Sequence, residues 1–146
     1  MTTIHDHLFR DLDPMTFHDL VKLRIDVFVV EQECPYPELD GRDTEPGTRH
    51  IWLEGTLGPV AYLRLLVEPD GAGRIGRVAT LPGARGNGLA GVLLEHVHAT
   101  TPGRLVLDAQ TYLAAWYASL GYLPSGEEFE EDGIAHIPMT RGPAGD

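Results

Sequence analysis

The sequence has little cysteine, little lysine and little positive charge overall. Its one cysteine, Cys34, has no partner for an intramolecular disulfide, so we expect a protein of a reducing compartment. Acidic residues outnumber basic ones by 22 to 11, and the formal net charge is −11 at pH 7. Because such a surface repels nucleic-acid phosphates and anionic lipid, the charge excludes a nucleic-acid-binding role.

A long hydrophobic run is absent too. No apolar stretch approaches membrane-spanning length, and the opening "MTTIHDHLFRDLDP" has neither the basic region nor the apolar core of a signal peptide. We therefore expect a cytoplasmic protein without a membrane partner. With 146 residues, 42% of them hydrophobic and 23% charged, the chain is predicted to form a single domain over 1–146, with a frayed tail at 142–146.

The hydrophobic pattern predicts alternating helices and strands without an internal repeat. Asp13 and Pro14 fit the N-cap and first position of a helix over 14–29, whose apolar residues recur at three- and four-residue spacing. The following segment, 34–48, is rich in proline and glycine and is predicted to be an acidic loop. The further expected elements are strands at 49–54, 59–68 and 73–80, a helix at 88–100, a strand at 103–109, a helix at 112–120, and a final hairpin of 122–127 with 135–140.

The connections between these elements predict how the strands pair. Short turns join strands 49–54, 59–68 and 73–80, so these strands are expected to pair antiparallel. Strand 73–80, the helix after it and strand 103–109 form one parallel βαβ unit instead. The sequence therefore predicts an α+β fold with a mixed, mostly antiparallel central sheet, one parallel βαβ unit and flanking helices.

A glycine cluster, "GARGNGLAG" at 83–91, stands between a predicted strand and a predicted helix. Gly86, Gly88 and Gly91 spell G-x-G-x-x-G, but "LPGAR" separates them from the strand and antiparallel strands precede them, so we interpret the match to a dinucleotide fold as accidental. A phosphate loop of the Walker type needs a lysine here, and the one lysine, Lys22, lies in the first helix. A tight turn without a ligand is the plain alternative.

A third pattern in the same cluster is R-x-x-G-x-A, formed by Arg85, Gly88 and Ala90 immediately before a helix. Amides at a helix N-terminus favour an anion, and small residues let the backbone approach it closely. The pattern resembles the coenzyme A signature, Q/R-x-x-G-x-G/A, of the GNAT acetyltransferase superfamily. This resemblance implies the GNAT fold and acetyl-CoA as co-substrate.

Other segments carry the same resemblance over nearly the whole chain. "WYASLGY" at 116–122 is similar to the family's tyrosine-containing helix and the strand after it. Within the superfamily, "RIDVFVVEQECPYPELDGRD" at 24–43, "RHI" at 49–51 and "FEEDGIAH" at 129–136 resemble the ElaA-type branch. Three separated matches in the right order favour membership over coincidence.

The resemblance implies direct transfer of an acetyl group from acetyl-CoA to a primary amine. Strands 73–80 and 103–109 should diverge beyond a bulge, so that the cofactor arm lies between them. Tyr117 would protonate the departing thiolate. Amides of three strand residues would polarise the thioester, and a loop cradle would hold the diphosphate. The implied cofactor-binding residues are Val78, Ala79, Thr80, Arg85, Gly86, Asn87, Gly88, Leu89, Ala90 and Gly91.

The attacking ammonium must first lose a proton, so the reaction needs a base or a water chain. Glu31 is our first choice, because the loop after the first helix forms one wall of the acceptor pocket in the family. The carboxylates of Glu33, Asp108, Glu130 and Glu131 are alternatives. Acidic runs at 31–45 and 127–132 favour a small cationic acceptor. Residues expected to contact that acceptor are Glu33, Tyr36, His50 and Asp108.

Histidine and cysteine offer two further chemistries, and we predict neither. Residues two apart on the predicted helix do not share a helix face, the other pair lies in the N-terminal segment, and no third or fourth ligand follows at suitable spacing. Cys34 stands in an acidic loop, which disfavours the thiolate, so we predict an inert thiol. The histidine pairs are His5 with His7 and His96 with His98.

The sequence is also compatible with two other functions. A non-catalytic acyl-CoA-binding or regulatory module would keep the cradle and lose turnover, although such a binder has no need of Tyr117. A nicotinamide enzyme would use the literal G-x-G-x-x-G, and we expect no NADH binding. Family members often form dimers, so the resemblance is compatible with a homodimer. The sequence does not specify which amine is the acceptor.

Overall fold

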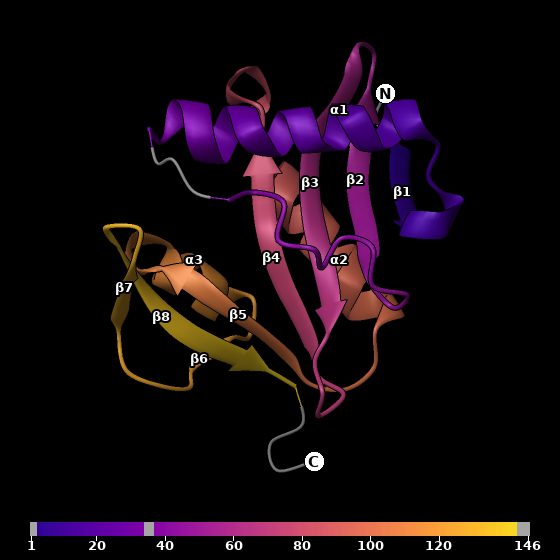
Figure 1. Cartoon of the computed structure of the whole chain (residues 1–146). Helices are drawn as coiled ribbons and strands as arrows, with labels where there is room; N and C mark the ends of the chain where they lie inside the picture. Colours follow the sequence, from indigo (N-terminus) through magenta and orange to yellow (C-terminus); the bar gives the residue numbers. More distant parts are fainter. Residues whose placement is uncertain (1–2, 34–36, 143–146) are drawn as a thin grey trace.

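The computed structural model describes residues 3–33 and 37–142, and its main feature is an eight-stranded mixed sheet (Figure 1). The strand order is β1-β2-β3-β4-β5-β8-β6, and β7 pairs with β8. The strands are β1 (Thr3–Leu8), β2 (Arg49–Gly55), β3 (Gly58–Val67), β4 (Gly73–Thr80), β5 (Leu105–Gln110), β6 (Leu123–Pro124), β7 (Phe129–Glu131) and β8 (Ile134–Arg141). The helices are α1 (Pro14–Ile25), α2 (Leu89–Thr100) and α3 (Ala114–Ser119).

The strand directions confirm the predicted α+β fold. Every described pair of neighbouring strands is antiparallel except β4 and β5, which run parallel and are connected through α2. Asp13 caps α1 as predicted, since its carboxylate accepts the Thr16 amide at 2.8 Å, and Pro14 is the first helical residue. The parallel unit therefore sits inside an otherwise antiparallel sheet.

Three local features differ from the prediction. The first helix does not continue as α-helix to residue 29: it ends at Ile25 and goes on as a π-helical turn over Asp26–Glu31. The polar segment Thr3–Leu8 forms β1, held by pairing with β2 rather than by its own strand propensity. The segment expected only to connect the final hairpin contains the short strand β7.

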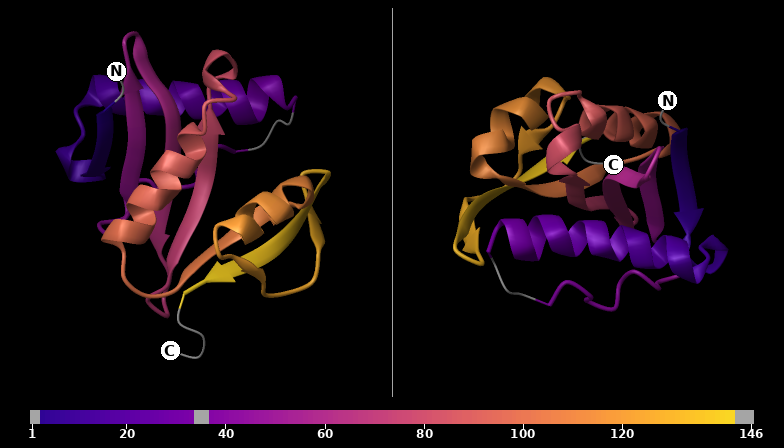
Figure 2. Two further views of the ribbon diagram at one scale, coloured as in Figure 1. Left: turned by 180° about the vertical axis from the view of Figure 1, so that it is seen from behind. Right: turned by 90° about the horizontal axis from the view of Figure 1, so that it is seen from above.

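Helices cover the two faces of the sheet unequally. Helix α1 crosses one face over β2, β3 and β4, while α2 and α3 pack on the other face (Figure 2). Apolar residues of α2 join the larger core cluster with β2–β5, and apolar residues of α1 join a second cluster with Trp52, Tyr62 and Ala79. On the α1 side, no described helix covers β5 and β8 (Figure 1).

The prediction that β4 and β5 diverge is confirmed. Their ladder holds two residue pairs, Gly73 with Leu105 and Arg74 with Val106, and then stops. The pairing of β4 with β3 shifts register at the same level, and Arg77 there has a left-handed φ of 53°. A bulge of this kind bends a strand and ends its pairing on one side. The edge of β4 beyond Arg74 is consequently open toward β5.

A buried network of charges fixes the loop before β2 onto the α1 face of the sheet. Arg24 of α1 is fully buried and donates to Glu38 at 2.5 Å and to Asp43 at 2.7 Å. Arg64 of β3 donates to Asp43 at 3.2 Å, and its other contacts go to a neighbouring aspartate of the loop. Burial alone would raise the pKa of Asp43, but hydrogen bonds and charge from the two arginines outweigh burial and lower it.

The Arg24→Ala variant tests how far the fold depends on this network. The substitution leaves Glu38 and Asp43 buried without their main partner, so we expect the free energy of unfolding to fall by about 3–5 kcal/mol. Urea unfolding measures the loss. The Arg10→Ala variant, at an exposed arginine, is the matched control and should change stability by less than about 0.5 kcal/mol. Equal stability of the two variants would contradict the importance of the network.

Candidate functional site

The start of α2 presents a row of unpaired backbone amides. Among the described residues, the amides of 86–91 donate to no backbone or side-chain acceptor, and the first bond at this helix end runs from the Val92 amide to the Gly88 carbonyl at 3.2 Å. Gly86 and Gly88 have left-handed φ values of 84° and 70°, a conformation that glycine adopts without steric strain. This end of α2 can therefore receive an anion.

The predicted cradle residues surround these amides with open space. A Cβ added at Gly86 or Gly88 would meet no atom within 4 Å, so ligand atoms can approach the backbone closely there. The Asn87 side chain donates to the Ala84 carbonyl at 3.1 Å, which fixes the loop from inside. Residues 86–91 thus lie together at the start of α2. The side chain of Asn87, predicted to contact the cofactor, instead donates a hydrogen bond within the loop.

The last residues of β4 lie beside this cradle and face the gap toward β5. Val78, Ala79 and Thr80 have no strand partner on the β5 side within the described residues, since that ladder ends at Arg74. Alternate backbone groups of Val78–Thr80 are therefore available to an extended ligand. We take the diverging strands and the amides at the start of α2 together as the candidate site.

Arg85 and Glu31, both named from the sequence, contact each other. The Arg85 guanidinium binds the Glu31 carboxylate through two atoms, at 2.5 and 2.6 Å, and its Nε donates to the Thr80 carbonyl at 3.0 Å. Hydrogen bonding and charge from Arg85 lower the pKa of Glu31. A carboxylate held in this way is a poor proton acceptor, so the geometry favours Glu31 as a partner that positions Arg85 rather than as a base.

Tyr117 lies on α3 with its ring in the larger core and its hydroxyl unpaired. The side chain is 6% exposed and packs edge-to-face on Trp116 and Tyr122. Burial raises the pKa of Tyr117 to about 12, so the hydroxyl keeps its proton at neutral pH. Of the described side chains, only Arg64 Nε and Thr111 Oγ1 are both fully buried and unpaired, so the unbonded Tyr117 oxygen retains contact with solvent.

The acidic loop corrects one expectation drawn from composition. Its carboxylates do not form a surface for cations, because the protein's own arginines bind most of them. Glu38 and Asp40 contact Arg77 as well as the buried network, and Glu45 contacts Arg42 at 3.1 Å. Among the described residues of 31–45, Glu33 is the carboxylate without an ion pair, and it is exposed. The exposed run Glu127–Glu131 is a second acidic surface.

The predicted acceptor contacts have different surroundings. His50 is fully buried, with Nδ1 2.7 Å from the Tyr62 hydroxyl and Nε2 3.0 Å from the Asp43 carbonyl, so it is a hydrogen-bonded strand residue that no acceptor reaches. Asp108 is exposed on β5 and accepts from Arg74 of β4 at 3.3 Å. Tyr36 lies outside the described residues, as does Cys34.

The paired histidines have separate partners. His5 stacks on Trp52 and His7 packs against it at a tilt, His96 contacts Asp6 at 2.8 Å, and His98 contacts the Tyr122 hydroxyl at 2.8 Å. In the described ranges 3–33 and 37–142, no group of three or more His, Cys, Asp or Glu side chains is arranged to hold a metal ion. No described helix is long and apolar enough to cross a membrane.

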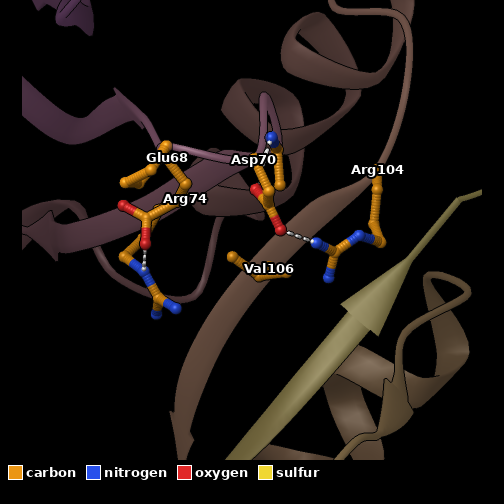
Figure 3. Close-up of a pocket in the computed structure, with 7 residues that line it drawn as sticks. Glu68, Asp70, Arg74, Arg104 and Val106 are labelled. Atoms are coloured by element: carbon orange, nitrogen blue, oxygen red, sulfur yellow. Dashed lines mark hydrogen bonds and ion pairs between the residues drawn. The ribbon is translucent and has the colours of Figure 1, made fainter.

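A pocket of about 300 Å³ lies at the other end of β4, beside the β3–β4 turn (Figure 3). Its arginines are already bound: Arg74 contacts Glu68 at 3.2 Å, and Arg104 forms an ion pair with Asp70. The Arg104 pair links the start of β5 to the turn, where the parallel ladder begins. We assign this pocket to the support of that ladder rather than to the candidate site.

Sequence reasoning missed the residues that hold the site in shape. Arg24 falls at the apolar spacing of its helix, and spacing alone does not reveal its ionic partners, while Arg77 carries no local sign of a bulge. The one available signal was the number of acidic residues in a loop with three prolines, which suggests partners elsewhere. Those partners come from three separate elements and cannot be paired by spacing.

Comparisons with known proteins agree with this geometry. Residues 24–142 match the family described as acetyltransferase (GNAT) domain. The chain is 48% identical to a UPF0039 protein of Mycobacterium tuberculosis, covering 93% of this chain and 90% of that protein. It is 39% identical to protein ElaA of Escherichia coli, covering 90% of each.

Two solved structures are similar over nearly their whole length. An acyl-CoA N-acyltransferase from Pseudomonas aeruginosa has a TM-score of 0.91 and 36% identity, covering 97% of this chain and 100% of that chain. Escherichia coli ElaA has a TM-score of 0.89 and 35% identity, covering 97% and 99%.

Proposed function

The chain belongs to the GNAT acetyltransferase family, in its ElaA-like branch, and from this premise we propose that it transfers an acetyl group from acetyl-CoA to a primary amine. The observation that carries the proposal is the row of unpaired amides at 86–91 beside a gap between two parallel strands. An acyl-CoA consists of an anionic diphosphate joined to an extended arm that contains amide groups. The two features of the site match those two parts.

The cofactor binds by backbone rather than by charge. Amides of 86–91 hold the diphosphate at the positive end of α2, and the glycines there leave room for its oxygens. The arm lies along Val78–Thr80 and completes the edge of β4 that β5 leaves open. An amide of this segment donates to the thioester oxygen, where negative charge develops during attack.

Tyr117 donates the proton that the leaving thiolate needs. Its raised pKa of about 12 keeps the hydroxyl protonated at neutral pH, and no described residue competes for that proton through a hydrogen bond. The acceptor approaches from the opposite side of the gap, where Glu33 and Asp108 are exposed. These carboxylates, together with the Glu127–Glu131 run, support a small cationic amine.

An amine panel tests the function directly. Small metabolite amines, polyamines, aminoglycoside antibiotics and peptide N-termini are incubated with acetyl-CoA and the protein, and free thiol is measured. We expect one class to release thiol well above the rate of hydrolysis. If acetyl-CoA binds and no amine raises thiol release, the chain is a non-catalytic acyl-CoA-binding module instead.

The Gly88→Ala variant tests the cradle. The added methyl group stands in the open space beside the amides, so we expect the Kd for acetyl-CoA to rise about 10- to 100-fold, equivalent to one or two lost hydrogen bonds to phosphate. Gly71→Ala is the matched control, because Gly71 also has left-handed φ and open space around it but lies in the β3–β4 turn. Equal affinities in calorimetry would refute the cradle.

The Tyr117→Phe variant tests the proton donor. We expect kcat to fall about 100-fold or more at neutral pH, with acetyl-CoA affinity unchanged, because only the proton transfer is removed. Tyr122→Phe is the control: Tyr122 is a buried tyrosine of the same cluster, and its hydroxyl contacts His98 instead. That variant should lose about 1 kcal/mol of stability and keep its turnover. A Tyr117→Phe enzyme with normal kcat would remove Tyr117 from the mechanism.

A further inference from the structure

The strands β5, β8 and β7 have a face that no described helix covers, and it carries functional groups that the mechanism above does not use. Opposite residues in antiparallel strands share a face, and the register pairs Asp108 with Pro138, Gln110 with His136, and Phe129 with His136. Pairing therefore places His136 between the end of β5 and the short strand β7. Figure 1 shows this face beside the gap between β4 and β5.

The face with His136 is on the acceptor side of the sheet. Leu105, Leu107 and Ala109 of β5 are buried in the larger core with α2 and Tyr117, so Asp108 and Gln110 point the other way. The contact from Arg74 to Asp108 at 3.3 Å confirms that this side of β5 continues across the gap to β4. It is the same side of the sheet as α1 and its π-helical turn, opposite to α2.

The surroundings of His136 fix which nitrogen carries the proton. Its Nδ1 is 2.8 Å from the Ile134 carbonyl oxygen, and because a carbonyl only accepts, Nδ1 must be the donor. In the neutral ring, Nε2 then has a free lone pair, and Nε2 contacts no described residue through a hydrogen bond or ion pair. Phe129 stacks on the ring with centroids 5.7 Å apart, which holds its plane.

We propose that His136 is the general base that accepts the proton of the acceptor ammonium at Nε2. This inference rests on the proposed acetyl transfer. Three of the carboxylates considered from the sequence are less suited: Glu31 is bound to Arg85, Asp108 is bound to Arg74, and Glu130 pairs opposite Ala135, on the other face of β7. An imidazole is also the side chain best matched to proton transfer near neutral pH.

The charged groups around His136 are consistent with an ammonium beside it. Asp108 faces the same side from β5 and Glu131 from β7, and Arg74 of β4, which contacts Asp108, also forms an ion pair with Glu68. Negative charge on both flanking strands attracts a cationic acceptor. The acceptor subsite is thus a cation-binding face with a base at its centre.

The reaction balances with the groups named. The ammonium gives one proton to Nε2 of His136, and the neutral amine forms a C–N bond to the thioester carbon. The C–S bond breaks, Tyr117 protonates the thiolate, and the second amine proton passes through water to restore Tyr117. The imidazolium of His136 then releases its proton to solvent. The products are the acetylamide, free thiol and one proton.

The His136→Gln variant tests whether His136 acts as a base or only supports the structure. A base is needed for an acceptor that binds as an ammonium and much less for an acceptor that is already neutral. The best acceptor of the amine panel is compared with an analogue in which the carbon next to the amine-bearing carbon is a CF3 group, because this trifluorinated amine is a weak base and is mostly neutral at pH 7. We expect His136→Gln to lower kcat/KM about 100-fold or more for the parent amine and less than about 5-fold for the fluorinated one, with the Kd for acetyl-CoA unchanged. His18→Gln, at an exposed histidine of α1, should leave both rates unchanged.

Three outcomes would overturn the proposal. Normal rates in His136→Gln, or an equal loss with both amines, would show that His136 is not the base. A wild-type protein that acetylates no amine while binding acetyl-CoA would overturn the proposed function, and this inference with it. The first two results require an active wild-type enzyme, so they are distinguishable from the third.

Discussion

The register shift at Arg77 is the constraint on which the site depends. If β4 and β5 stayed paired along their length, their ladder would occupy every backbone group that an acyl-CoA arm needs. Left-handed φ at a residue such as Arg77 costs about 1–3 kcal/mol, and it persists only where surrounding contacts compensate. Arg77 Nε donates to Glu38 at 3.0 Å, so the loop before β2 holds the bulge from the α1 face.

The same loop connects the bulge to the first helix. Glu38 accepts from Arg24 and from Arg77, and Asp43 accepts from Arg24 and Arg64, so one cluster of charges joins α1, β3 and β4. Buried ion pairs often add little net stability, because desolvation offsets attraction. Here the ion pairs determine where the bulge in β4 forms. Apolar side chains in their place would fill the same volume but would not determine the position of the bulge. The network is therefore better understood as a spatial constraint on the site than as a source of stability.

The sequence was most informative where structure is local. The strand at 73–80, the N-cap at Asp13 and the helix after the glycine cluster follow from capping, spacing and propensity, and the structure has them at Gly73–Thr80, Asp13 and Leu89–Thr100. The glycine cluster could be interpreted as a candidate cradle because glycine adopts left-handed backbone conformations, and this preference is encoded locally.

Features that depend on contacts between residues far apart in the sequence could not be predicted in this way. The strand β1 depends on contacts such as Arg49 with Asp6, separated by more than 40 residues, and its own residues are mostly polar. The pairing of Glu31 with Arg85 joins the end of the first helix to the cradle across the sheet. The sequence suggested separate roles, a base for Glu31 and a cofactor ligand for Arg85. In the structure the two side chains instead form an ion pair with each other.

The overall charge of −11 opposes the anion binding that we propose for this site, where the described residues include no unpaired cation. A protein so acidic repels an approaching diphosphate, and a lysine or arginine cluster would be the ordinary remedy. Here Arg85 is neutralised by Glu31, and the one lysine lies on α1 in an ion pair with Asp26. Binding by amides at a helix end adds no net charge, so the acceptor side can stay acidic. The two sides of the gap can thus attract ligands of opposite charge. Backbone amides at the start of α2 attract an anion, and carboxylates on β5 and β7 attract a cation.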